Sequence, residues 1–167
     1  MGWFTKDIKT MDDLFVHTLQ DIYYAEHQIK KSLPDMIEKA TSPELQQGFQ
    51  AHLQQTDGHI ARLKQVFKQH GAEEKAVTCP AIDGILSEAS DIASDVDDKQ
   101  VLDAALIAAA QAVEHYEITR YGTLVAWAKL LGREDCAALL KQNLDEESAT
   151  DAKLTKLATS VVNRQAA

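Results

Sequence analysis

Apolar residues recur at intervals of three or four along four long stretches of the chain, which is the spacing of one buried helix face. In the first stretch, residues 11 to about 40, Thr10 and Asp13 have the spacing of a capping box, with Asp in the usual place of Glu. Pro34 falls inside this stretch and removes a backbone hydrogen bond. We therefore predict one long helix that bends at the proline.

The other three stretches have equally distinct ends. Ser42 and Pro43 supply a cap and a proline for the first helical position, which predicts a second helix over residues 42–70. A third helix, opened by an acidic cap, is predicted over residues 98–132, and a last one from about Arg133 onward. Each pair of neighbouring helices is joined by a turn short enough to form an antiparallel hairpin.

The two hairpins are joined by a connection of different texture, residues 72–98, which includes a short amphipathic segment. It is too long for a hairpin loop and long enough to run back along a bundle. Two hairpins joined by one long crossover is the connectivity of ferritin-like bundles. We predict an all-α, ferritin-like four-helix bundle, a single domain over residues 1–167 whose crossover carries a short fifth helix. An N-terminal extension, residues 1–9, precedes it, with Trp3 and Phe4 available to cover a groove or a partner.

Acidic residues interrupt the apolar faces of these helices. In the most apolar part of the chain, residues 112–122, Glu114, Glu117 and Tyr121 fall on the inward stripe. A carboxylate in a protein core must be neutral, paired or bound to a cation, because burying it alone costs several kcal/mol. Two acids three residues apart on one helix face therefore point to a cation.

Inward polar positions on the other helices are predicted to meet these two glutamates. Each residue advances a helix by about 1.5 Å, and counting from the hairpin turns places the polar positions near mid-bundle at one height. The two halves of the chain also place polar residues at corresponding positions, and such a two-fold arrangement suits a pair of metal ions. The candidate metal ligands are Glu26, His59, Glu114, Glu117, Glu147 and Asp151.

Four segments of the chain carry a resemblance to a known family: residues 24–28, 52–63, 105–123 and 144–157, of which 108–123 is the most specific. They resemble the YciE/YciF-like family of bacterial stress-associated proteins, a branch of the ferritin-like superfamily. The resemblance implies a helical bundle, usually dimeric. It also implies a carboxylate-lined centre similar to that of rubrerythrin and other di-iron proteins.

The second and last helices depart from a full di-iron ligand set, in which the second helix carries Glu-x-x-His. Thr56 stands three residues before His59, where that motif has Glu, and the last helix has Thr150 or Asp151 where a further His is expected. The candidate set is rich in oxygen and poor in nitrogen. Such a set favours one or two ions of iron or manganese, or even magnesium, over zinc or copper.

Each candidate also has an interpretation without metal. Glu117 could form a buried ion pair with Arg120 or a hydrogen bond with Tyr121, and the same two partners are available to Glu114. His52 and His59 lie along one edge of an apolar face, where histidines are more often half-exposed or satisfied by a neighbour. Two functions therefore stay open: an iron or manganese protein with ferroxidase or peroxide-scavenging activity, or a non-catalytic dimeric stress-associated protein with a remnant metal site.

The composition of the chain indicates its cellular location and limits the classes of partner that it can bind. The net charge of −9 argues against nucleic-acid binding, which depends on Lys and Arg. No apolar run approaches the ~20 residues of a membrane span, and two isolated cysteines without a secretory segment favour the cytoplasm. Apolar residues on more than one helix face predict a homodimer. These residues are Val101, Leu102, Leu106, Ile107, Val125 and Trp127.

Overall fold

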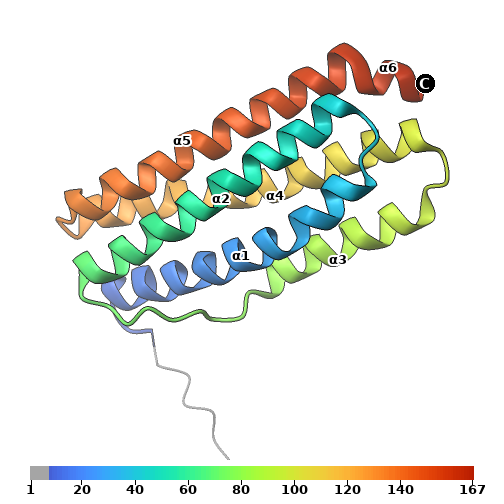
Figure 1. Ribbon diagram of the computed structural model, residues 1–167. Helices are drawn as coiled ribbons and strands as arrows, with labels where there is room; N and C mark the ends of the chain where they lie inside the picture. Colours follow the sequence, from blue (N-terminus) through green and yellow to red (C-terminus); the bar gives the residue numbers. More distant parts are fainter. Residues whose placement is uncertain (1–7) are drawn as a thin grey trace, which may run out of the picture.

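Helices make up nearly all of the computed structural model, which describes residues 8–167 (Figure 1). In chain order they are α1 (Met11–Lys39), α2 (Pro43–His70), α3 (Pro80–Asp95), α4 (Lys99–Leu130) and α5 (Glu134–Leu157). A π-helical turn, η1 (Ala158–Val162), extends α5 into the short α6 (Asn163–Ala166). No strand occurs in the described part of the chain. The all-α fold and the fifth helix in the crossover are confirmed, whereas the predicted role of Trp3 and Phe4 concerns residues outside the described range.

Local sequence signals set the helix ends within one or two residues of the predicted positions. At the start of α1, the backbone N–H of Asp13 donates to Thr10 Oγ1 over 3.0 Å, and Thr10 N–H donates back to the Asp13 carboxylate over 3.0 Å. Pro34 lies within α1, which continues through it as one helix. At the end of α2, Gly71 has a φ of 75°, a left-handed conformation that glycine adopts without steric cost.

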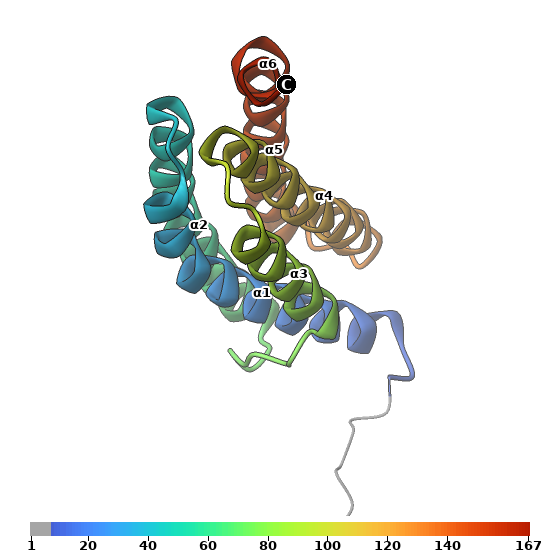
Figure 2. The ribbon, with the colours of Figure 1, turned by 90° about the vertical axis from the view of Figure 1, so that its right-hand side faces the viewer.

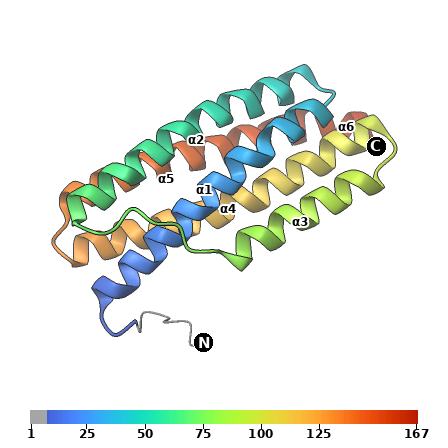
Figure 3. The same cartoon turned by 60° about the horizontal axis from the view of Figure 1, so that its bottom comes forward.

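Two antiparallel hairpins, α1 with α2 and α4 with α5, form the bundle (Figures 1 and 2). The crossover passes over α1, where Val77 N–H donates to the Gln20 carbonyl over 3.2 Å, and α3 then lies along α4 (Figure 3). The turn between α1 and α2 is held to α4 by buried Asp103. This carboxylate accepts hydrogen bonds from the backbone N–H groups of Thr41 and Ser42, over 2.7 and 2.8 Å.

Helix α3 and the bundle core cover most of the apolar residues that α4 carries on more than one face. Leu102, Leu106 and Ile107 are buried within the single chain, and so is Val125. Of the residues that led to the homodimer prediction, only Val101 is among the exposed large hydrophobics. The surface of α4 therefore does not by itself require a second copy of the chain. Among residues 8–167, no helix combines the length and the apolarity needed to cross a bilayer.

Candidate metal centre

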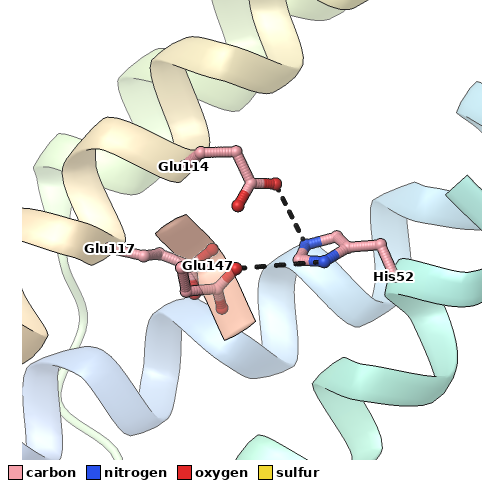
Figure 4. A group of neighbouring side chains, drawn as sticks. All are labelled: His52, Glu114, Glu117 and Glu147. Atoms are coloured by element: carbon pink, nitrogen blue, oxygen red, sulfur yellow. Dashed lines mark ion pairs between the residues drawn. The ribbon is translucent and has the colours of Figure 1, made fainter. Parts of the chain in front are cut away.

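Six polar side chains from four helices converge in the middle of the bundle, and all of them are at most 3% exposed. Their donor atoms form two groups, within each of which the atoms lie no more than 4.8 Å apart, and Glu147 belongs to both groups. Group 1 consists of His52 from α2, Glu114 and Glu117 from α4, and Glu147 from α5 (Figure 4). Group 2 consists of Glu26 from α1, His59 from α2, and Glu147. The shared carboxylate makes the two groups one centre.

In group 1, the imidazole of His52 faces carboxylates from two other helices (Figure 4). Its Nε2 lies 3.3 Å from Glu114 Oε1, and its Nδ1 lies 3.9 Å from Glu147 Oε2. Glu117 extends from the next turn of α4 towards the same space. Helical spacing explains this placement, because residues three apart on α4 share a face.

In group 2, the imidazole of His59 lies between carboxylates on both sides. Its Nδ1 is 2.8 Å from Glu147 Oε1 and 3.3 Å from Glu26 Oε1. Its Nε2 is 2.9 Å from Glu146 Oε2, and Arg62 forms an ion pair with that same oxygen at 2.6 Å. An outer carboxylate on one ring nitrogen is the usual way in which a protein orients a metal-binding histidine by its other nitrogen.

Many polar atoms of this centre have no hydrogen-bond partner. Ten buried side-chain nitrogen and oxygen atoms of the described residues lack a hydrogen-bond partner, and nine of them belong to the two groups. They include both ring nitrogens of His52, both carboxylate oxygens of Glu117 and both of Glu147. The atoms approach one another without the angles of a hydrogen bond. Donor atoms that converge on a common space without pairing are what a bound cation requires.

Burial and mutual repulsion control the charges of this centre. Burial, then the charges of Glu147 and Glu26, raise the pKa of Glu114 to about 11. The pKa of Glu117 is raised well above its ordinary value for the same reasons. Burial alone would lower the pKa of His59, but its contacts with Glu147 and Glu26 outweigh burial and raise it to about 10. Burial likewise opposes ionisation of Glu147, but the contact with His59 lowers its pKa. Without a metal, protons therefore supply part of the positive charge.

Polar side chains around the centre hold one of its carboxylates in place. The hydroxyl of Tyr121, which is fully buried, donates a short hydrogen bond to Glu26 Oε1. Asn143 Nδ2 donates in turn to the Tyr121 hydroxyl over 3.0 Å. This chain of hydrogen bonds links α1, α4 and α5 and fixes the position of one carboxylate oxygen, leaving Glu26 Oε2 unpartnered.

Five of the six ligand candidates meet in this centre. Asp151 does not, since its carboxylate accepts from Gln111 Nε2 over 2.9 Å and lies 3.1 Å from Nε2 of exposed His115. His52 joins the centre, although the sequence placed it only at the edge of a helix face. Its spacing from His59, seven residues or about two helical turns, was the available signal.

Two interpretations without metal can be compared with the structure. His52 and His59 are buried, not half-exposed, because α5 packs against α2 and carboxylates of Glu114 and Glu147 lie against the two rings. His59 does have neighbouring partners, in Glu146 and Glu147. Arg120 does not pair with Glu117. Its guanidinium lies over the ring of Tyr116, 5.2 Å from the ring centroid, and 3.7 Å from Asp21, on another face of α4.

Comparison with known proteins gives matches over nearly the whole chain. Residues 10–167 match the family described as a domain of unknown function, DUF892. Protein YciF of Escherichia coli (strain K12) is 44% identical over 161 residues, which cover 96% of this chain and 97% of that protein. A solved structure from Rhodopseudomonas palustris, described as "YcfI, a putative structural protein", has a TM-score of 0.89 and 56% identity and covers 92% and 98% of the two chains.

Two further solved structures have the same fold. That of the E. coli stress protein YciF has a TM-score of 0.90 and 44% identity, covering 93% of this chain and 99% of that one. A protein from Xanthomonas campestris pv. campestris has a TM-score of 0.75 at 22% identity, covering 93% and 95% of the two chains, and so shares the fold.

Proposed function

The chain belongs to the DUF892 family of YciF-like proteins, and we propose that it binds iron or manganese at the mid-bundle centre. Each group would hold one ion, and Glu147 belongs to both groups. The proposed activity is the oxidation of the reduced metal by oxygen or peroxide, as in a ferroxidase or a peroxide scavenger.

The observation that carries this proposal is the set of unpartnered buried donors, which comprises four carboxylates and two imidazoles. Di-iron and di-manganese bundle proteins use the same inventory, a Glu from each of two helices and Glu-x-x-His from each of the other two. Here the inventory is distributed differently. Helix α2 supplies two histidines and no acid, while α4 supplies Glu114 and Glu117. The loss of Glu at position 56 is thus compensated on another helix.

A bound ferrous or manganous ion would supply single electrons to an oxidant. The chain's own residues hold and tune the centre. Glu146 and Arg62 fix the ring of His59 from outside, and Tyr121 fixes Glu26. Four buried carboxylates offset the charge of two divalent ions, so a loaded centre would be close to neutral and compatible with its apolar surroundings.

Metal analysis tests the proposal. Protein purified without chelator is loaded anaerobically with Fe(II) or Mn(II), desalted and analysed for bound metal. We expect up to two ions per chain. Glu147→Gln, which alters the residue shared by both groups, should lose at least one of them. Asp145→Asn is a matched control, because this exposed acid on the same helix pairs with Lys141 at 2.6 Å. Absence of bound metal after loading would refute the proposal.

A second candidate, a non-catalytic dimeric stress-associated protein, has two observations in its favour. One is Thr56, a hydroxyl in the position of the usual ligand acid on α2. The other is the description of the R. palustris relative as a putative structural protein. This candidate predicts that metal neither binds nor stabilises the protein, and that Glu147→Gln destabilises it by removing the partner of buried His59.

A further inference from the structure

A cavity of about 360 Å³ lies among α1, α2, α4 and α5 and reaches the metal centre. This volume is at the lower end of the range of ligand pockets, about 300–1,000 Å³. Taking ~30 Å³ for an atom the size of water, the cavity has room for about 12 non-hydrogen atoms. Much of its buried wall is apolar, including Leu33, Leu45, Phe49, Val113 and Leu154.

Two members of group 1 also line this cavity. His52 and Glu114 are 3% and 2% exposed, and both His52 ring nitrogens and Glu114 Oε2 lack hydrogen-bond partners. A buried polar atom without a partner is destabilising. In the metal-free protein, a polar group of a ligand at this point would supply that partner, while the apolar remainder of the ligand would lie against the wall.

Small residues border the cavity on its solvent side. Gly48 and Ala51 are exposed positions on α2 that line it, together with exposed Lys153 on α5. A Cβ atom added to Gly48 would meet no other atom within 4 Å. Larger side chains at these two positions of α2 would therefore project into open space beside the cavity.

We propose that the cavity binds an alkyl hydroperoxide, with its apolar chain along the wall and its hydroperoxide group at the place where His52 and Glu114 would hold an ion. This assignment rests on the proposed function and specifies its substrate class. A loaded centre with four carboxylates and two divalent ions carries no excess positive charge, which favours a neutral head group over a carboxylate. Hydrogen peroxide would leave the apolar wall without a partner.

The reaction balances with two ferrous ions as one-electron donors. The O–O bond of ROOH breaks and accepts two electrons, one from each ferrous ion, together with two protons. The products are ROH and water, and two ferric ions remain. The alcohol has the same chain as the substrate, so an unreactive alcohol serves as a probe of the cavity without metal.

The first experiment measures octanol binding to the metal-free protein by calorimetry. The double variant Gly48→Leu/Ala51→Leu places larger side chains beside the cavity and leaves both ligand groups unchanged. Gly84→Leu is the control, because Gly84 is exposed on α3 and a Cβ there also meets open space. We expect binding to the parent and to Gly84→Leu, and at least tenfold weaker binding to the double variant. Equal binding to all three proteins would overturn the assignment of the cavity.

The second experiment compares single-turnover oxidation of the Fe(II)-loaded proteins by octyl hydroperoxide and by hydrogen peroxide. In the double variant the rate with octyl hydroperoxide should fall at least tenfold, with the rate for hydrogen peroxide and the iron content unchanged. Equal rates for octyl hydroperoxide in parent and variant would overturn the inference while iron still binds. A parent that binds octanol but takes up no iron would instead overturn the proposed function, and the hydroperoxide assignment with it.

Discussion

Replacing Glu117 by Gln tests the charge state of the centre most directly. Glu117 is fully buried, neither of its oxygens has a hydrogen-bond partner, and its pKa is raised well above the ordinary value. In the metal-free protein at neutral pH it is therefore protonated, whereas in the unfolded chain it is ionised. Gln has nearly the same shape and removes the need to take up a proton on folding.

The linkage between proton uptake and folding gives the size of the effect. Keeping a glutamate neutral at pH 7, when its unfolded pKa is about 4.3, costs at most roughly 4 kcal/mol at 1.36 kcal/mol per pH unit. The amide of Gln must also find partners among the same atoms, which offsets about 1–3 kcal/mol. We expect a net gain on the order of 2 kcal/mol for the metal-free variant. In a chain of this length that raises Tm by about 4–8 °C.

The sign of the pH dependence provides a second readout. A carboxyl whose folded pKa is raised contributes stability that is fully present below the unfolded pKa and is lost as the pH rises. The metal-free parent should therefore lose more stability than Glu117→Gln between about pH 4 and pH 7. Towards the acidic end the advantage of the variant should disappear and then reverse, because only the cost of the amide remains there. Urea unfolding at several pH values measures this difference.

Metal should reverse the order of the two proteins. Binding to the native state stabilises the parent by about 2.7 kcal/mol at a hundredfold excess over Kd, and the variant by less because a ligand is lost. Glu88→Gln, an exposed substitution on α3, is the control and should change stability by no more than about 0.5 kcal/mol. A less stable Glu117→Gln variant, combined with no thermal shift of the parent by Fe(II) or Mn(II), would refute the metal centre.

Three further predictions follow from individual contacts. Without metal, the stability contributed by His59, whose pKa is raised to about 10, should be fully present below about pH 6.5 and lost as the pH rises through about 10; urea unfolding that showed stability increasing over this window would contradict it. Asp103→Ala should lose about 3 kcal/mol, because the backbone N–H groups of Thr41 and buried Ser42 lose a charged acceptor, whereas exposed Asp97→Ala should change little in the same assay. Tyr121→Phe should lose about 1–2 kcal/mol by leaving Asn143 Nδ2 without its acceptor and should weaken metal binding in a competition titration; unchanged affinity would remove Tyr121 from the support of Glu26.

The fold followed from the sequence because the signals that specify it are local. The capping box at Thr10, the Ser42-Pro43 start of α2 and the glycine after it each act within a few residues. Helical periodicity then identifies the inward face, and the length of the crossover limits the topology. Glu26, Glu114, Glu117 and Glu147 could be assigned for the same reason, since an acid on an otherwise apolar stripe must lie inside.

The errors lie at the edges of the helix faces. At an edge, a side chain is buried or exposed according to how closely the next helix packs, and that distance is not encoded in the helix's own periodicity. His52 is buried because α5 packs against α2 and the Glu114 side chain of α4 reaches its ring. Asp151, one turn beyond Glu147, lies where Gln111 and His115 reach it, and its contacts lead away from the centre. The homodimer stays a prediction, but the crossover helix and the bundle core bury most of the α4 residues on which it was based.

The energetic cost of the centre bears on the choice between the two proposed functions. Each buried polar atom left without a partner costs about 1–3 kcal/mol, a sizeable part of the 5–15 kcal/mol by which a typical domain is stable. A polar centre whose purpose is packing specificity is expected to be satisfied internally, as Asp103 is by Thr41 and Ser42. The same chain thus satisfies a buried carboxylate fully where it joins two segments, and leaves at least one oxygen of each of four carboxylates without a hydrogen-bond partner where they face two histidines. That contrast favours a centre completed by cations over one that serves the fold alone.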